Sequence, residues 1–497
     1  MKKSIKGIVI AGAVLTSLFT VGAQAQHVNA KSYSKAVTKI AGTKNYPIYH
    51  KVTKNGPSGK FTSTSYFKYG QIQSKQYVST KKGNFWNIIV DGRPVGWVSE
   101  NFFARNTISV ANDVSLVKNS DYSFNTRDAI NYATDSHGTA IDPDRVQVSQ
   151  ASVSTKATKV NYSYGKAKAS VNIDVRSGNG EMGEANVTPK SGFKTTTTWN
   201  GGSKGSSRNW NAAHHYTSET TSNTFKSNGL TLRTRLFQPC FVSLGYGQSA
   251  DKMGQVGVIP EGMTVNGGIF ATSMFTSSSD QHGHIVSYNL NAIKSKYAVQ
   301  NLTTMNWSTF KSYANNIKVS PYIKLGHGQS LGSSSDYIYV MANDNNYNNG
   351  PRSEEIIQIR KSDMKINKIW TFRIAENRYI HNATFVGDNT MYALFHSGGH
   401  NHYEYWKLTR NGDSWKATEV GATAGSFVSN SPVQGFAYGN GSFFIGFNDN
   451  IFKVSENGAA QKHYRFNTRR EIEGLSANGS DLYVQFAQRA ELTQGRF

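Results

Sequence analysis

The sequence predicts an all-β protein with more than one domain. Its 497 residues are enough for about three domains of ordinary size. Gly is abundant, with 46 residues, and charged residues make up only 17% of the chain, which is typical of β-rich globular domains with polar turns. Short runs of alternating apolar and polar residues recur without a long amphipathic helical pattern, so we expect strands throughout.

The first element is a secretory signal peptide, predicted over residues 1–25. A start with three lysines precedes an apolar run over 8–21, and Ala23-Gln24-Ala25 has the small-x-small pattern of a cleavage site. An uncleaved anchor is the alternative, but no charged stop follows the apolar run. No other apolar run approaches the roughly 18 residues of a membrane span, so we expect no transmembrane segment in the mature chain.

The charge balance indicates an acidic partner outside the cell. The chain has 54 Lys and Arg against 31 Asp and Glu, and removal of the signal peptide leaves 51 against 31. Nucleic acid is not expected there, whereas teichoic acids supply phosphate in Gram-positive walls. Cys240 is the only cysteine, so there is no internal disulfide, and its apolar neighbours favour a core residue. We expect a secreted, cell-wall-associated protein with teichoic-acid-type polymers or peptidoglycan as partner.

Residues 31–106 hold four or five short strands and many aromatic residues. The stretch NFWNIIVDGRPVGWVSENFF, residues 84–103, has Asp91-Gly92 as a hairpin turn between Trp86 and the Gly96-Trp97 pair. It resembles the bacterial SH3-like GW module. The resemblance implies an SH3-like barrel that attaches to the cell wall.

Aromatic and cationic side chains of this region are the candidate wall-binding residues. Aromatic faces stack on sugar rings, and ammonium groups meet phosphates. The alternative is that the aromatic residues only fill a small barrel core. The candidates are Trp86, Trp97, Lys75, Lys81 and Lys82.

The next two regions are predicted to separate the barrel from the C-terminal domain. Residues 111–176 contain ATDSHGTAID, KVNYSYG and ASVNIDV and resemble bacterial immunoglobulin-like (Ig-like) domains, which implies a sandwich that serves as a spacer. Residues 177–228 are rich in Gly, Ser, Thr and Asn with almost no aliphatic residues. Such a composition cannot bury a core, so we expect a flexible linker.

Residues 229–497 repeat one template five times. Each copy opens with a polar residue beside a small one, continues through a Gly, Asn, Asp or Ser turn and ends in an apolar-aromatic strand. The equivalent aromatic residues are Phe270, Tyr339, Tyr392, Phe444 and Tyr483. Their spacing fits one four-stranded blade per copy, which predicts a five-bladed β-propeller. A strand from the start of the zone, such as Leu230 to Phe237, is expected to close the ring.

Three phrases of this zone carry a further resemblance. GHGQSLGSSSDYIYV, VQGFAYGNGSFFIG and REIEGLSANGSDLYV are similar to the helveticin J family of large bacteriocins from lactic acid bacteria. The resemblance implies antibacterial activity toward related bacteria. It does not indicate which residues would carry a killing mechanism.

The polar openings of the templates are expected to ring one mouth of the propeller channel. Such a ring can close the propeller by bonding neighbouring blades, bind a sugar or a cation, or do acid–base work between Glu261 and Glu473. The three alternatives stay open. The ring residues are Glu261, Gln329, His381, Asn382, Gln434 and Glu473.

Enzymatic activity is uncertain and the sequence favours its absence. The usual protease and esterase signatures are missing, and the catalytic candidates Glu261 and Glu473 have only their position to support them. The His-rich loops near 282–284 and 396–402 lack carboxylates at a recognised metal spacing. We therefore expect no metal and no cofactor.

Three functions fit these observations. The first is a secreted, wall-associated, bacteriocin-like protein that binds anionic wall polymers and acts against related bacteria. The second is a non-enzymatic adhesin or glycan-binding protein for surfaces of target or host cells. The third is a propeller glycoside hydrolase.

Overall fold

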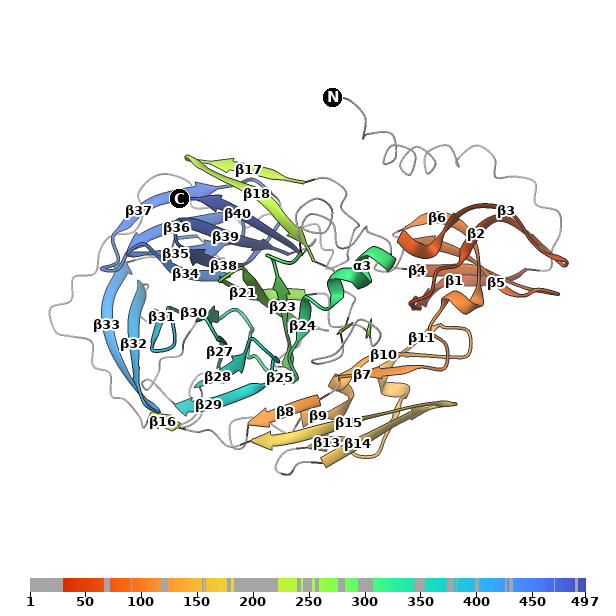
Figure 1. Ribbon diagram of the computed structural model, residues 1–497, viewed down its shortest axis with the longest axis horizontal. Coiled ribbons are helices and arrows are strands. Elements are labelled where there is room, and N and C mark those ends of the chain that lie inside the picture. The colour runs from red at the N-terminus through yellow and green to blue at the C-terminus, as the bar shows by residue number, and fades with distance from the viewer. Residues whose placement is uncertain are drawn as a thin grey trace. The chain divides into compact units, whose positions relative to one another are not determined.

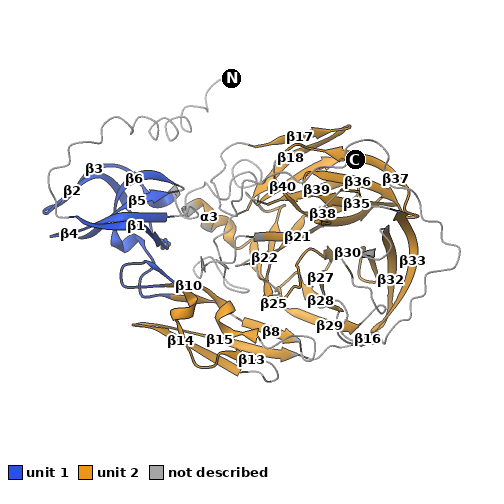
Figure 2. Ribbon diagram, turned by 180° about the vertical axis from the view of Figure 1, so that it is seen from behind, with its two compact units in different colours: residues 1–107, 134–141 blue, residues 108–133, 142–497 orange. Residues whose placement is uncertain are grey.

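Two compact units make up the chain in the computed structural model, residues 1–107 with 134–141 and residues 108–133 with 142–497 (Figure 2). The predicted signal peptide, Asp91, Cys240 and His381 lie outside the described residues. The described residues are 30–66, 72–90, 92–111, 113–117, 124–153, 156, 158–176, 180–182, 222–238, 243–244, 253–254, 259–275, 282–293, 307–343, 354–372, 380, 382–397, 402–424, 427–428, 432–468, 470–487 and 490–497.

The first unit is built on one six-stranded antiparallel sheet, in the order β1-β4-β5-β6-β2-β3. Its core contains Ile48, Trp86, Ile88, Val98 and Phe102, and the strand-rich region predicted for an SH3-like barrel is confirmed. The strands are β1 (Lys31–Lys39), β2 (Pro47–Thr53), β3 (Gly56–Ser63), β4 (Ile72–Thr80), β5 (Gly83–Val90) and β6 (Arg93–Ser99).

Two glycines explain the local sequence of this sheet. Gly92 adopts a φ of 78° in the tight turn that joins β5 to β6, where Val90 pairs with Arg93, a backbone conformation that favours glycine. Gly96 lies where β6 meets β2, and a Cβ there would be 2.8 Å from the carbonyl oxygen of Tyr49. The Gly of the Gly-Trp pair therefore permits close approach of the two strands.

The second unit begins with a small β-sandwich. Strand β8 pairs in parallel with β15, which pairs with β14 and then β12, while β7 pairs with β10 and β9 with β13. Buried Val160 and Ile173 alternate with exposed residues, as expected for strands with one solvated face, whereas Val114, Ser115 and Leu116 of β8 are all buried. The strands are β7 (Ile108–Val110), β8 (Asp113–Val117), β9 (Phe124–Asn125), β10 (Ile130–Thr134), β12 (Gln147–Val148), β13 (Ser152–Val153), β14 (Thr158–Tyr164) and β15 (Ala167–Arg176). The intervening strand β11 (Ala140–Ile141) belongs to the first unit.

The rest of the second unit is a five-bladed β-propeller (Figure 1). Blade 1 has β21 (Ile259–Asn266), β22 (Ile269–Phe275), β23 (His282–Asn289) and β24 (Ile317–Val319). Blade 2 has β26 (Leu331–Ser333), β27 (Tyr337–Asn343), β28 (Glu354–Arg360) and β29 (Ile366–Phe372). Blade 3 has β30 (Asn382–Phe385), β31 (Thr390–Ser397), β32 (His402–Asn411) and β33 (Ser414–Ala424).

Two further blades and several short elements complete it. Blade 4 has β34 (Gly435–Gly439), β35 (Ser442–Phe447), β36 (Asn450–Ser455) and β37 (Ala460–Arg465). Blade 5 has β38 (Ile472–Asn478), β39 (Asp481–Phe486), β40 (Glu491–Arg496) and β18 (Leu230–Phe237). Short elements are helix α3 (Trp307–Ala314) and strands β19 (Ser243–Leu244), β20 (Met253–Gly254) and β25 (Tyr322–Lys324). β25 pairs with β8, so strand pairing joins the sandwich to blade 1.

The blades are buried on both faces because each packs against its two neighbours. Separate apolar clusters fill the spaces between consecutive blades, for example Ile338 with Ile285 and Phe436 with Tyr405. The innermost strands contact one another in the cyclic order β21-β26-β30-β34-β38 and back to β21. All five predicted aromatic positions fall on the second strand of their blade. The five-bladed prediction is confirmed.

Blade 5 combines the beginning and the end of the propeller sequence, as predicted for Leu230 to Phe237. β18 pairs with the final strand β40, so the outer edge of β40 is covered. Thr234 and Arg470 both donate to the fully buried carboxylate of Glu491, and Asn223 donates at 2.9 Å. A buried polar network therefore fastens the two ends of the ring.

Two short pieces of the predicted linker form strands. β16 (Gly180–Met182) pairs in parallel with β29 of blade 2, and β17 (Thr224–Ser227) adds to β18 of blade 5. The remainder of 177–228, apart from residues 222, 223 and 228, lies outside the described residues.

Candidate functional site

The polar-small pairs that open the templates have a clear structural reason. A Cβ on Gly262 would lie 2.5 Å from the carbonyl carbon of Gln329, and one on Gly474 would lie 3.0 Å from a backbone nitrogen of β21. Glycine thus lets one innermost strand pack against the next. The residue before each glycine, Glu261 or Glu473, points the other way because neighbouring side chains alternate along a strand.

The polar residues of different blades meet in one hydrogen-bonded group, which we name the axial cluster. Gln329 Nε2 donates to Gln434 Oε1 and, at 3.5 Å, to Glu261 Oε2. Asn382 Nδ2 lies 3.5 Å from Gln329 Oε1. The structure therefore brings together five of the six residues predicted for the channel mouth, and His381 lies outside the described residues. The axial cluster is Glu261, Gln329, Asn382, Gln434, Glu471 and Glu473.

Glu471 is the member that the sequence analysis missed. Gln434 Nε2 donates to Glu471 Oε1 at 2.7 Å and to Glu473 Oε1 at 3.4 Å. Glu471 directly precedes β38, whose register shifts between Ile472 and Gly474. A period-two pattern therefore does not apply there, and only the structure shows that Glu471 joins the cluster.

Glu473 is the most deeply buried carboxyl group of the cluster. It is 5% exposed, and burial together with the charges of Glu261 and Glu471 raises its pKa well above the usual value.

This geometry bears on the ring-closing alternative. Gln329 of blade 2 donates to Gln434 of blade 4 and to Glu261 of blade 1. Gln434 in turn donates to Glu471 and Glu473 at the start of blade 5. The axial cluster therefore bonds side chains of different blades to one another, as that alternative requires.

The structure corrects the prediction that Trp86 contacts a wall polymer. Trp86 is 1% exposed, its Nε1 donates to Glu100 Oε2 at 2.8 Å, and Lys39 Nζ lies 3.2 Å from the centroid of its ring. No face of the ring is open to a sugar. Trp86 instead follows the alternative, in which the aromatic residues fill the barrel core. Its ring is buried, and its indole N–H donates a hydrogen bond to the buried carboxylate of Glu100.

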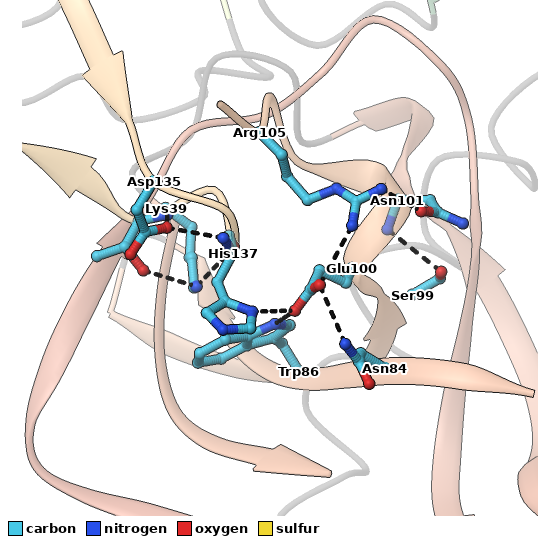
Figure 3. A network of polar contacts seen from close by, with 10 residues as sticks. Lys39, Asn84, Trp86, Ser99, Glu100, Asn101, Arg105, Asp135 and His137 are labelled. Carbon is cyan, nitrogen blue, oxygen red and sulfur yellow. Dashed lines mark hydrogen bonds and ion pairs between the residues drawn. The ribbon is translucent and has the colours of Figure 1, made fainter. Parts of the chain in front are cut away.

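A polar network surrounds Trp86 within the first unit (Figure 3). Glu100 also accepts from His137 Nδ1 at 2.8 Å and from Asn84 and Arg105 at 3.2 Å. Burial alone would raise the pKa of Glu100, but the hydrogen bonds from Trp86, His137 and Asn84 outweigh it and lower that pKa. Lys39 Nζ donates to the His137 carbonyl at 2.8 Å, so the network fastens residues 134–141 to the sheet.

The other wall-binding candidates remain on the surface. Trp97 is half-buried, and Lys75, Lys81 and Lys82 are exposed. The turn between β4 and β5 lies beside the turn between β2 and β3, since Lys81 N donates to the carbonyl of Lys54 at 3.1 Å. The carbon chain of Lys82 lies over Gly56. We name Lys54, Lys81 and Lys82 the lysine corner; Lys54 is also exposed.

Other kinds of site were sought in the same part of the chain. No group of three or more His, Cys, Asp or Glu among the described residues is arranged to hold a metal ion. In that described portion, no helix is both long and apolar enough to cross a membrane.

Comparisons with known proteins add little to this geometry. No protein-family model matches the chain, and no curated protein matches it. Matching solved structures include a glucose dehydrogenase (12% identity, 56% of this chain and 99% of that chain, TM-score 0.31). Another is BamB from Moraxella catarrhalis (9% identity, 56% of this chain and 98% of that chain, TM-score 0.24). A third is a virginiamycin B lyase from Staphylococcus aureus with quinupristin (12% identity, 57% of this chain and 83% of that chain, TM-score 0.28). Because these TM-scores are low, the propeller assignment rests on the strand pairing described above.

Proposed function

We propose that this chain is a secreted, cell-wall-associated protein of the bacteriocin-like helveticin J type. Its first unit binds anionic wall polymers, and the whole protein acts against related bacteria. The observation that carries the proposal is the lysine corner. Two neighbouring turns there hold three ammonium groups on one exposed edge, and their backbones are joined by a hydrogen bond.

The acidic residues of the first unit do not neutralise this edge. Residues 30–107 and 134–141 contain 13 Lys and Arg against 3 Asp and Glu. Glu100 is buried under Trp86, His137 and Arg105. Asp135 accepts from the backbone nitrogens of His137 and Thr139 at 2.8 and 2.9 Å. The surface charge is therefore mostly positive, which favours a polyphosphate as partner.

A sedimentation assay with isolated walls tests the wall-binding part. Full-length protein carrying Lys54→Gln, Lys81→Gln and Lys82→Gln should bind teichoic-acid-containing walls less tightly than the parent chain. The slope of log affinity against log salt should fall by about one for each lysine removed, because each phosphate contact releases a counterion. Walls stripped of teichoic acid should bind weakly in every case.

A second triple variant controls for the change in net charge. Lys159, Lys166 and Lys168 are exposed on the β14–β15 hairpin of the other unit. Their replacement by Gln removes the same charge and should leave wall affinity nearly unchanged. Equal losses in the two variants would show that net charge, rather than the lysine corner, drives binding.

The antibacterial part needs its own assay. The purified full-length protein should inhibit growth of related Gram-positive strains, and the lysine-corner variant should require a higher concentration. Wall binding without growth inhibition would favour the adhesin or glycan-binding function instead. Release of reducing sugar that disappears in Glu473→Gln would favour the hydrolase instead.

A further inference from the structure

We propose that one face of the six-stranded sheet binds the sugar substituents of the anionic wall polymer, while the lysine corner binds its phosphates. This inference deepens the proposed function and rests on it, because the polymer is the same. The face is defined by one residue from each strand, and these six residues lie opposite one another across the whole sheet. We name them the cross-strand row: Lys60, Tyr49, Trp97, Asn87, Gln76 and Ser32.

The cross-strand row faces away from the main core of the first unit. Neighbouring side chains alternate along a strand, and the residues beside the row, Ile48, Trp86 and Val98, belong to that core. The members of the row are instead half-buried or exposed. Adjacent strands lie about 4.8 Å apart, so the four steps from Lys60 to Gln76 span about 19 Å. That length is sufficient for several consecutive units of an extended polymer.

Tyr49 and Trp97 are adjacent in the row and form an aromatic platform. The buried ring of Phe85 packs against Tyr49, with the two ring centroids 6.2 Å apart and the ring planes at 79°. Trp97 packs against the same apolar cluster. These contacts hold both rings in place, while each side chain keeps part of its surface exposed. A ring that is already fixed loses little conformational freedom on binding, and its π face attracts the C–H groups of a sugar.

Asn87 and Gln76 place two amide groups beside this platform. Asn87 Nδ2 donates to Gln76 Oε1 at 2.9 Å, which orients both amides. Each amide has further donor and acceptor capacity beyond this one bond, and both side chains are half-buried rather than fully covered. A sugar ring has an apolar C–H face and an edge of hydroxyl groups. Aromatic rings with neighbouring amides match both of these features.

The charges around the row favour a sugar that is carried on a phosphate polymer. Lys60 ends the row, and Lys51 lies two residues beyond Tyr49 on β2, so it shares the same face; both lysines are exposed. Lys54 of the lysine corner follows five residues after Tyr49, about 16 Å along an extended chain. None of the six members of the row is acidic. One polymer chain can therefore contact the row and the lysine corner together, which the uncharged sugars of peptidoglycan would not require.

Isothermal titration of the full-length protein with two soluble polymers tests the sugar contact. The probes are glycerol phosphate oligomers of equal length, one plain and one with glucosyl substituents. We expect the parent chain to bind the glucosylated oligomer at least about fivefold more tightly. The lysine-corner variant should lose affinity for both oligomers and keep the ratio of the two affinities. Equal binding of the two oligomers by the parent chain would overturn this inference, whereas unchanged affinities in the lysine-corner variant would contradict the proposed function.

Two variants connect the sugar preference to the row. Trp97→Ala should bring the affinity ratio of glucosylated to plain oligomer close to one and leave binding of the plain oligomer nearly unchanged. Asn87→Ala should lower the same ratio, and it gives the test if Trp97→Ala does not fold. Tyr164→Ala removes a half-buried ring from the β14–β15 hairpin of the other unit and should keep the parental ratio. An unchanged ratio in both row variants, or an equal fall in Tyr164→Ala, would overturn the inference.

Discussion

Replacing Glu473 by Gln should make the propeller more stable at neutral pH than the parent chain. Gln has nearly the same shape, keeps a hydrogen-bond donor and cannot ionise. The folded-state pKa of Glu473 lies well above the value of 4.5 that the free side chain has. A group with a raised folded pKa contributes its full stability below the unfolded pKa and loses it as pH rises toward the folded pKa. The variant is free of this loss.

The magnitude follows from linkage. Between the unfolded and folded pKa values, the parent chain loses about 1.4 kcal/mol of unfolding free energy for each pH unit. For a propeller of this size, about 2–4 °C of Tm corresponds to each kcal/mol. The Tm advantage of the variant should therefore grow by about 3–6 °C for each pH unit between these two pKa values.

Differential scanning calorimetry of the full-length proteins measures this difference. The scans run from just above the unfolded pKa to neutral pH, and the comparison is the Tm of Glu473→Gln minus that of the parent chain at each pH. Asp413→Asn is the control, because its carboxylate is exposed and its offset should stay constant with pH. If the difference for Glu473→Gln is also constant, Glu473 is not protonated in the folded state and the reasoning fails.

Three further changes test other parts of the structure. Glu491→Gln removes the carboxylate that pairs with the buried guanidinium of Arg470. It should lower the unfolding free energy of the propeller by about 3–5 kcal/mol. A negligible shift in the calorimetric Tm would contradict the role of this network in ring closure. Gly458→Ala places a Cβ 2.1 Å from a backbone oxygen and should cost about 1–3 kcal/mol more than Gly412→Ala, a glycine that also has a positive φ but lies in open space. Chemical denaturation compares the two variants, and equal losses would refute the close packing of blades 3 and 4. Glu100 has a lowered pKa, so its contribution to the unfolding free energy is present above the unfolded pKa and is lost as pH falls through the folded pKa. Glu100→Gln should remove this acid sensitivity and speed hydrogen exchange of the β5 amides at neutral pH. Identical exchange in the variant and the parent chain would contradict the stabilising role of Glu100.

Local sequence patterns were sufficient to predict the architecture of the propeller. Alternation of apolar and polar residues is decided within a strand, and turn residues mark its ends. Five copies of one pattern therefore indicated five blades, and the unpaired strand at Leu230 to Phe237 indicated how the ring closes. The same logic placed Glu261 and Glu473 together, because equivalent positions of a closed ring face one axis.

Other features depended on contacts between distant residues. The sequence around Trp86 is the same whether its ring faces water or Glu100, and only packing decided that it is buried. The lysine corner exists because Lys54 and Lys81, on different turns, share a backbone hydrogen bond. Periodicity along a strand shows which side chains share a face, but not what covers that face. The environment of each functional side chain was therefore settled by tertiary structure, while the number and order of the blades were already determined by the sequence.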